Sequence, residues 1–436
     1  MNNNMKILIL SSTPWRDDNS FGDSYSNIFG NIKEIEIANI YCSMGLPNNS
    51  IASHFFQMSE KKLLLNLIDK ENKTGDIVLI PNRKDNELTP VPIATKEQKI
   101  FRFFQKNRYM VFMWAREIIW FLGRWKSKEL NKFIDDFNPD LIFTPIYINP
   151  YMNRIGLYVK KYSGKKMLGY VSDDVYTLRQ FSINPFFWID RLVNRFFVKK
   201  VVDQCDLLYV ISDIQKKDYD VCFNKDCHIL FKGGNFDVIP VRKPINTPVK
   251  LLYTGNIGAG RYKSLALIGE ALDKINEDGV KAILTIYSQT PLNKKKSTTL
   301  LNFKSLSFRG GISQEEVKIK QQEADVLIYV ESFDLREKLM VRQSFSTKIV
   351  DYLRSAKCIF AVGSTICASI DYLIDNDAAI VATHKNEIEV KLTQLIKSPE
   401  KLINYGYKAW QCGKKNHQIE DIQATLLRDF NQILNK

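Results

Sequence analysis

Glycine and proline are scarce in this chain of 436 residues, which holds 20 glycines and 14 prolines. Collagen-like and low-complexity disordered chains need a much larger share of both, so these classes are excluded. Cysteine is also sparse, with seven residues scattered over the whole length. The chain is therefore not a small disulfide scaffold, and this cysteine usage is typical of a reducing compartment.

Long apolar runs are missing as well. A membrane-spanning helix needs roughly 18–20 predominantly apolar residues, and the longest candidate, at 111–122, is shorter and is interrupted by Arg116 and Glu117. The first ten residues carry one lysine and an apolar run much shorter than the core of a secretory signal. We therefore expect a cytoplasmic protein without a transmembrane helix.

Acidic residues are outnumbered, since 62 Lys and Arg face 48 Asp and Glu, which leaves a formal charge of +14. Aromatic residues are many, with 26 Phe, 19 Tyr and 6 Trp. Both features favour an anionic partner such as a membrane surface, a phosphorylated substrate or nucleic acid. No recognisable RRM, KH, helix-turn-helix or zinc-finger pattern occurs, so nucleic acid is not the expected partner.

Metal chemistry has little support in the sequence. The pair Cys222 and Cys227, followed by His228, has the wrong spacing for a zinc ribbon and no second cluster follows it. The four histidines are isolated from one another. We expect no metal site.

Short apolar or β-branched runs alternate with amphipathic, helix-like stretches along the chain. This pattern predicts parallel sheets covered by helices on both faces. The strands are expected at 6–10, 35–41, 76–80, 140–145, 167–172, 207–212 and 228–232, and then at 249–254, 281–287, 324–330, 358–362 and 378–383.

The segment 235–248 separates these two sets of strands. It contains Pro240, Pro244 and Pro248 with little apolar content, as a linker would. We therefore predict an α/β protein of two doubly wound, Rossmann-like domains, 1–240 and 241–415, followed by a C-terminal helix in 416–436. In such sheets ligands bind beyond the carboxyl ends of the strands, so two facing sheets would form one cleft.

The strongest local pattern runs from Gln343 to the strand at 358–362. Ser346 is a plausible N-cap of a helix over 347–357, whose free N–H groups, with Thr347 and Lys348, would suit a phosphate or diphosphate. Asp351 lies one turn deeper on nearly the same face, where its carboxylate could accept hydrogen bonds from a ribose diol. The alternative is a capped core helix with an exposed aspartate.

A second pattern is the glycine-rich loop that follows the strand at 249–254. Its three glycines permit close backbone approach, and Arg261 or Lys263 could neutralise a phosphate. The spacing matches neither the dinucleotide fingerprint nor a Walker loop, and an ordinary strand-to-helix turn is the alternative. The glycines are Gly255, Gly258 and Gly260.

Two further loops follow predicted strands in the first half. One, at 11–27, is rich in small and polar residues and contains Gly22; it would line the cleft. The other carries Asp173 and Asp174, either of which could accept a proton or bind a sugar hydroxyl. A helix N-cap is an equally good interpretation of this pair.

Basic and aromatic residues are interleaved over 96–128, with nine Lys or Arg against two Glu. This composition is typical of a helix that lies in a membrane interface. A second such segment, 186–200, holds Trp188, Phe196 and Phe197 beside four basic residues. The alternative is that the aromatics are core residues and the bases are solvated.

In these motifs the chain resembles the GT-B glycosyltransferases, in particular the family 4-like enzymes of bacterial surface-polysaccharide assembly. Tyr253-Thr-Gly-Asn256-Ile, with Gly258 and Arg261, is similar to the family's diphosphate loop, and 346–359 to its nucleotide-binding helix and following strand. The resemblance implies two domains facing across a cleft, with the acceptor on the N-terminal domain and the donor on the C-terminal one. It also implies a last helix, 416–434, that crosses back to the N-terminal domain.

The family's helix ends a Glu-x7-Glu motif. Asp351 matches its second position, which holds the ribose, whereas Gln343 stands at the first, near the donor sugar. Arg261, Lys348 and the helix start at Ser346 and Thr347 would stabilise the leaving diphosphate without a metal, and Gly22 would face it from the other domain. Asp173 or Asp174 acting as a base would favour inversion.

The resemblance thus implies a hexosyltransferase that takes a UDP- or GDP-linked sugar as substrate, needs no cofactor and retains anomeric configuration. Its acceptor would be a lipid-linked sugar or a glycan, at the inner face of the membrane. Two alternatives stay open: a nucleotide-sugar epimerase of the same fold, and a non-catalytic protein that binds anionic polymers.

Overall fold

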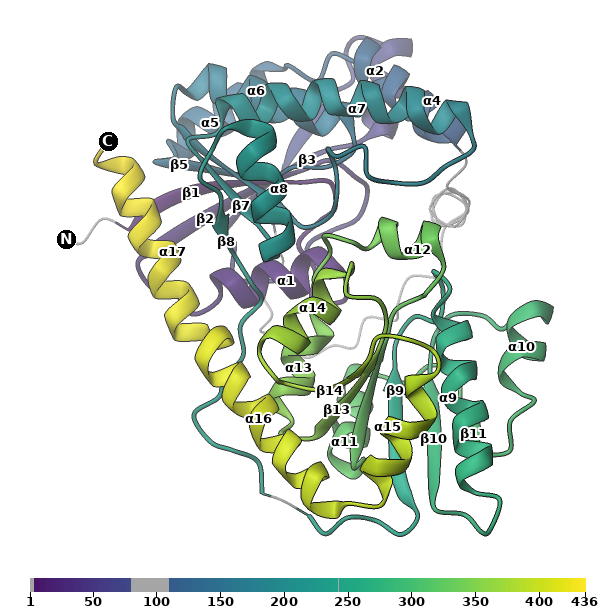
Figure 1. The fold of residues 1–436 in the computed structure, drawn as a ribbon. Helices are drawn as coiled ribbons and strands as arrows, with labels where there is room; N and C mark the ends of the chain where they lie inside the picture. The colour runs from purple at the N-terminus through teal and green to yellow at the C-terminus, as the bar shows by residue number, and fades with distance from the viewer. Residues whose placement is uncertain (1–3, 80–109, 242) are drawn as a thin grey trace, which may run out of the picture. The chain divides into compact units, whose positions relative to one another are not determined.

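The computed structural model describes residues 4–79, 110–241 and 243–436. The chain forms two compact units (Figure 1). The first consists of residues 1–171, 188–209 and 426–436, and the second of residues 172–187 and 210–425. Residues 210–240 were expected in the N-terminal domain. They belong to the second unit, because most of their contacts are with residues of that unit. The end of the last helix belongs to the first unit.

The first sheet has eight strands within the described residues, in the order β4-β3-β2-β1-β5-β6-β7-β8. The pairings of β1 with β2 and β5, of β2 with β3 and of β5 with β6 are parallel, whereas β4 pairs antiparallel at the edge. The strands are β1 (Met5–Ser11), β2 (Ile35–Tyr41), β3 (His54–Met58), β4 (Gly75–Val78), β5 (Leu141–Pro145), β6 (Lys166–Val171), β7 (Leu207–Val210) and β8 (His228–Ile229).

The helices between these strands begin and end at residues suited to those positions. Ser127 caps α5 by accepting from the Leu130 N–H, and Gly164 ends α6 in the left-handed region. The helices are α1 (Ser20–Phe29), α2 (Glu60–Ile68), α4 (Met110–Leu122), α5 (Lys128–Phe137), α6 (Pro150–Ser163), α7 (Pro185–Gln204) and α8 (Asp213–Phe223).

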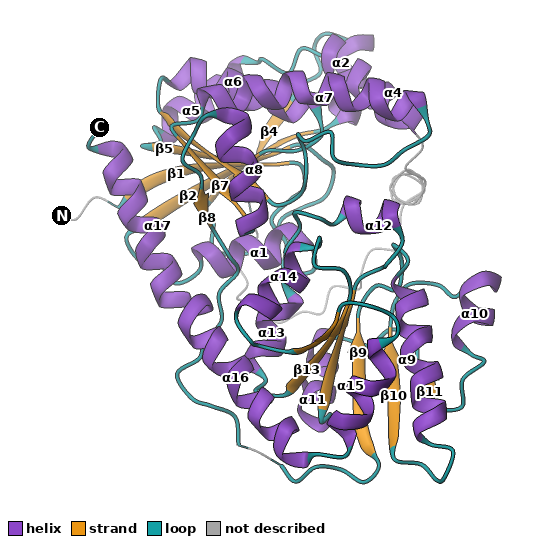
Figure 2. Cartoon of the chain, viewed as in Figure 1, coloured by secondary structure: helices purple, strands orange, loops and turns teal. Residues whose placement is uncertain are grey.

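The second sheet lies in the second unit and has the order β11-β10-β9-β12-β13-β14, with every adjacent pair parallel. Figure 2 shows these strands between helices. They are β9 (Val249–Thr254), β10 (Ala282–Tyr287), β11 (Leu306–Phe308), β12 (Val326–Val330), β13 (Cys358–Val362) and β14 (Ile380–Ala382).

Nine further helices follow α8 along the described part of the chain. They are α9 (Arg261–Ile275), α10 (Lys294–Leu300), α11 (Gln314–Glu323), α12 (Leu335–Met340), α13 (Lys348–Arg354), α14 (Ala368–Asp375), α15 (Glu387–Ile396), α16 (Pro399–His417) and α17 (Ile419–Leu434). In the first unit, α17 is held by the Tyr209 hydroxyl, which donates to Asp429 at 2.9 Å.

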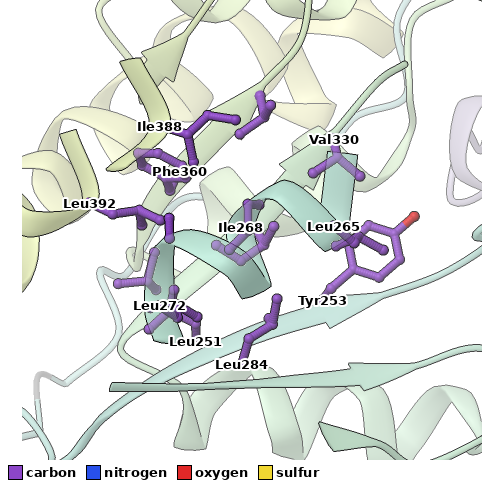
Figure 3. Packing of buried hydrophobic residues seen from close by; sticks show 14 of the residues in the cluster. Leu251, Tyr253, Leu265, Ile268, Leu272, Leu284, Val330, Phe360, Ile388 and Leu392 are labelled. Carbon is purple, nitrogen blue, oxygen red and sulfur yellow. The ribbon is translucent and has the colours of Figure 1, made fainter. Parts of the chain in front are cut away.

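The core of the second unit lies between the sheet and helices α9 and α15 (Figure 3). Leu251 and Tyr253 of β9 belong to this core together with Leu265 and Ile268 of α9. Because successive side chains of a strand point to opposite faces, Leu252 is left for the other face, and it too is buried. Burial on both faces explains why the strands are continuous apolar runs.

The predicted α/β class with two Rossmann-like domains is confirmed. Strands β9 and β13 have the predicted bounds, whereas β3 and the three-residue β11 were not predicted. The helix expected over 347–357 is shorter, because Ala356 takes a positive φ of 52° after its end, and its N-cap is Thr347 rather than Ser346. Ile80 and residues 96–109 of the basic segment lie outside the described residues.

None of the helices in the described ranges combines the length and apolar character that crossing a bilayer requires.

Candidate functional site

A cavity of about 220 Å³ lies at the carboxyl ends of β9 and β12 in the second unit. This is the edge of a parallel sheet at which ligands bind. The residues lining it come from both strand ends, from the glycine-rich loop and from the start of α13. They are Tyr253, Asn256, Arg261, Tyr329, Val330, Glu331, Ser346, Lys348 and Tyr352.

Arg261 is the first residue of α9, and its guanidinium is held by Glu331, which directly follows β12. Nε donates to Oε2 and Nη2 donates to Oε1, each at 3.0 Å. The Tyr329 hydroxyl also donates to Oε1, at 2.7 Å. Burial by itself lowers the pKa of Arg261, but the attraction and hydrogen bonds of Glu331 outweigh it and raise that pKa. The arginine is therefore a fixed, permanent cation.

Lys348 is the first residue of α13 and supplies a second cation. Its Nζ lies 5.4 Å from the centre of the Tyr253 ring. Burial, and secondarily the positive charge of Arg261, lowers the pKa of Lys348 to about 8. Within the described part of the chain, no hydrogen bond or ion pair reaches this ammonium. A cation without a carboxylate partner in a cavity is suited to an anionic ligand.

The glycine-rich loop brings its backbone close to Lys348. Gly255 has a φ of +138°, and a Cβ built on it would lie 1.9 Å from Lys348 Nζ. Gly260 has a φ of +73°, and a Cβ there would lie 2.3 Å from the hydroxyl oxygen of Ser332. Only glycine fits at these two positions, because they combine positive φ with close approach. Asn256 closes the loop by accepting from the Gly258 N–H at 2.5 Å.

The predicted nucleotide-binding residues of α13 are divided between the cavity and its surroundings. Ser346 lines the cavity with Lys348, whereas Thr347 is the N-cap of the helix and makes no capping hydrogen bond. Asp351 lies in the first turn, outside the cavity lining, with its side chain 36% exposed. Its carboxylate is 3.9 Å from Lys232 Nζ.

Gln343 does not line the cavity, because it is fully buried in the loop before α13. Its amide Nε2 donates to Asp218 at 2.6 Å, and its backbone carbonyl accepts from the Ser212 hydroxyl at 2.7 Å. Asp218 also pairs with Arg342. Gln343 thus ties the loop before α13 to helix α8.

Asp173 and Asp174 also lie outside the cavity lining. Asp173 accepts from the Ser344 hydroxyl at 2.7 Å, and burial raises the pKa of its carboxyl. Asp174 is buried and accepts from the backbone N–H of Thr177 at 2.8 Å. This is a local turn and not a helix N-cap, because the next helix, α7, begins only at Pro185.

Gly22 belongs to the first unit, in the first turn of α1. A Cβ built on it would lie 1.7 Å from the carbonyl oxygen of Arg16. The first turn of α1 therefore requires glycine at this position because the backbone of Arg16 lies against it.

Glu331 and Tyr329 were not predicted from the sequence. The available signal was that a charged residue directly follows the apolar strand β12, at the edge where ligands bind. The partner of Glu331 lies 70 residues away in the sequence, and no local pattern joins them.

Clusters of three or more His, Cys, Asp or Glu that could hold a metal ion do not occur among the described residues.

The chain matches no protein-family model, and no curated protein matches it.

Solved structures resemble it over its whole length. Sucrose-phosphate synthase from Thermosynechococcus elongatus has a TM-score of 0.62 at 12% identity, covering 99% of this chain and 100% of that one. HepE from Anabaena, in complex with UDP and glucose, has a TM-score of 0.62 at 10% identity, covering 98% and 100%. The fold is GT-B.

A third GT-B structure, described as trehalose-6-phosphate from E. coli bound with UDP-2-fluoro glucose, has a TM-score of 0.62 at 10% identity, covering 98% of this chain and 99% of that one. Likeness at these identities concerns the fold. The predicted GT-B fold is thereby confirmed, whereas a family 4-like assignment and a role in surface polysaccharide stay predictions.

Proposed function

We propose that this GT-B chain is a glycosyltransferase that moves a hexose from a nucleotide-diphosphate sugar to a hydroxyl group of a lipid-linked or polysaccharide acceptor. One observation carries the proposal: Lys348, a cation with no hydrogen bond or ion pair to any described residue, shares a cavity with Arg261 at the carboxyl ends of β9 and β12. Two positive groups beside a glycine-rich loop suit a diphosphate. Structures of the same fold that contain UDP or UDP-glucose support the choice of ligand.

The chemistry that follows needs stabilisation of a leaving group. The bond between the anomeric carbon and the diphosphate oxygen breaks, and the electron pair leaves with the nucleoside diphosphate. Lys348 and Arg261 would stabilise the negative charge that develops there, which is the interaction that lowers the barrier. Because these cations belong to the protein, we propose that transfer needs no metal.

We propose that configuration is retained. Glu331 is the carboxylate that lines the cavity, and both of its oxygens already accept hydrogen bonds. The leaving diphosphate oxygen would therefore take the proton of the attacking hydroxyl, which places the acceptor on the face that the diphosphate leaves. Asp351 on α13 would hold the ribose. Proton NMR of the product's anomeric signal distinguishes retention from inversion.

Titration calorimetry tests the donor assignment directly. We expect UDP or GDP, and one of their sugar conjugates, to bind, and excess EDTA to leave both binding and transfer unchanged. Binding of oligonucleotide alone would contradict the proposal and favour an anionic-polymer binder. Interconversion of the nucleotide sugar without an acceptor would identify an epimerase instead.

We also propose that the protein docks on the inner face of an anionic membrane through the segments 96–128 and 186–200. The described parts of both segments expose apolar side chains at helical spacing, which places them on one face of each helix. On α4 these are Ile118, Phe121 and Leu122, and on α7 they are Ile189, Leu192, Val193 and Phe196. The Trp114 indole N–H donates to Asp190 at 3.0 Å and joins the two helices.

Other aromatics of the first segment are not available to a membrane. Trp120 and Trp125 are buried, and Arg116 is bound to Glu60. The docking proposal therefore rests on exposed residues, with Arg124, Lys126 and Lys128 supplying charge beyond the end of α4. Each basic residue near an anionic surface adds about 1 kcal/mol.

Co-sedimentation with vesicles of varied anionic lipid content tests this surface. We expect a variant with Ile118, Phe121 and Leu122 changed to serine to lose vesicle binding. A matched variant with three exposed apolar residues elsewhere changed to serine, Val221, Val280 and Ile319, should sediment as the wild type does. Equal sedimentation of all three proteins would show that α4 is an ordinary surface helix.

A further inference from the structure

We infer that Glu331 is a positioning residue of the proposed donor site: it holds the guanidinium of Arg261 in the orientation that receives a diphosphate. The inference rests on the proposed function, because it assigns a role within the same cavity. No motif in the sequence pointed to this residue.

The geometry fixes the arginine at two points. Nε and Nη2 donate to the two carboxylate oxygens of Glu331, each at 3.0 Å, so the plane of the guanidinium is set by the plane of the carboxylate. Nη1 carries two further N–H groups, and no bond from them to any described residue is formed. The pair thus uses one edge of the guanidinium and leaves the other for a ligand in the cavity that Arg261 lines.

Glu331 is itself held firmly. It is 3% exposed, and the Tyr329 hydroxyl donates to Oε1 at 2.7 Å. Its backbone carbonyl accepts from the Ser264 hydroxyl of α9 at 2.7 Å, which fastens the end of β12 to the helix that begins with Arg261. A carboxylate with these contacts is a poor general base, since both oxygens are occupied, but it is a rigid support.

The charge of Glu331 has a second effect within the cavity. Arg261 and Lys348 repel each other, and Glu331 partly offsets this repulsion, as its attraction opposes the fall in the pKa of Lys348 that burial and Arg261 cause. The remaining titratable groups that line the cavity are phenols, and burial raises the pKa of each of them. They are Tyr253, Tyr329 and Tyr352.

The test is the affinity for inorganic pyrophosphate and for UDP and GDP between pH 6.5 and 9.5, measured by titration calorimetry on the full chain. Glu331→Gln removes the charge and one of the two acceptors for Arg261. Its matched control is Asp334→Asn, because Asp334 also pairs with a cation of α9, Lys263 at 2.6 Å, but the pair is exposed.

We expect Glu331→Gln to bind pyrophosphate about tenfold more weakly at pH 7, as misplacement of a binding group does. We also expect the pH at which affinity falls, near 8 in the wild type, to move lower by about half a unit or more, because Lys348 loses a nearby negative charge. Asp334→Asn should change neither quantity. The shift of the midpoint reports the lost charge beside Lys348, whereas the tenfold loss of affinity at pH 7, where Lys348 is mostly charged, reports the misplaced Arg261.

Unchanged or tighter binding by Glu331→Gln at pH 7 would overturn the inference, wherever the midpoint lies, while leaving the donor site intact. Failure of the wild type to bind pyrophosphate, UDP and GDP would overturn the proposed function and this inference with it. Should Glu331→Gln not fold, Tyr329→Phe keeps the carboxylate but removes the hydrogen bond to Oε1, together with a contact to Ser369, and should weaken binding in the same direction. Wild-type affinity in that variant would then refute the positioning role.

Discussion

Replacing Lys348 with methionine removes the ammonium from the cavity while keeping an unbranched side chain of similar length. Methionine suits the position because the lysine stem is packed against Gly255 and the Tyr253 ring. The backbone of α13 should therefore be unaffected. What is lost is a charge-assisted hydrogen bond to the diphosphate, worth about 1.5–3 kcal/mol, so UDP or GDP should bind roughly 10- to 150-fold more weakly.

The pH dependence gives a second magnitude. The pKa of Lys348 is lowered to about 8, so the ammonium is mostly charged at pH 7 and mostly neutral at pH 9.5. Since only the charged form attracts the diphosphate, affinity should fall as pH rises through 8, by about 30-fold between pH 7 and 9.5 if the bound lysine stays protonated. The terminal phosphate of the nucleotide ionises near pH 6, so it contributes little to this fall.

Titration calorimetry of wild type, Lys348→Met and Lys263→Met at several pH values checks both magnitudes. Lys263 is an exposed lysine in the first turn of α9, paired with Asp334, and its loss should matter little. We expect a pH-independent, weakened affinity only for Lys348→Met. A flat profile in the wild type, or wild-type affinity in Lys348→Met, would refute the assignment of Lys348 to the diphosphate.

Three further predictions concern residues around the cavity. Asp351→Ala should weaken nucleotide binding by about 1.5–3 kcal/mol. It should leave the melting temperature unchanged, because the side chain is part-exposed and its ion pairs with Lys232 and Arg354 are long. Unchanged affinity by calorimetry would show that Asp351 is an ordinary surface residue. Gln343→Glu should lower the free energy of unfolding by about 2–3 kcal/mol in urea titrations, because it places a second carboxylate beside that of Asp218. Equal free energies of unfolding in the variant and the wild type would show that the hydrogen bond between Gln343 and Asp218 is unimportant. Burial lowers the pKa of His417 to about 4. Between pH 6.5 and 4 the imidazole is therefore protonated in the unfolded chain but not in the folded one, and the free energy of unfolding should fall by about 3 kcal/mol as pH drops through this range. In urea titrations at several pH values, His417→Gln should lack this part of the acid sensitivity.

The sequence predicted where the strands of the second unit lie better than it predicted which strands are neighbours in the sheet. Continuous apolar runs mark β9 and β12 because both faces are buried, but nothing in either run says that these two strands are neighbours in the sheet. That adjacency is what brings Arg261, after β9, to Glu331, after β12. Lys348 and Arg261 were predicted as phosphate ligands from local patterns alone, and the structure places both in one cavity.

Other predictions were limited because they too depend on contacts between residues that lie far apart in the sequence. Gln343 was considered for a role near the donor sugar, yet its surroundings depend on Asp218 and Ser212, which lie more than 120 residues earlier. The strand β3 begins with an exposed histidine, so its apolar pattern is too short to stand out. The surroundings of such residues are set by tertiary contacts, which local sequence patterns do not show.

The contact between Gly255 and Lys348 has a consequence for engineering this site. The space that a side chain at position 255 would occupy is already filled by the lysine amine, so the two positions share one volume. A change at 255 would displace the amine before it altered the loop, and a shorter residue at 348 would open room for a larger one at 255 only if the positive φ were also relieved. Attempts to redesign donor choice should therefore vary the two positions as a pair.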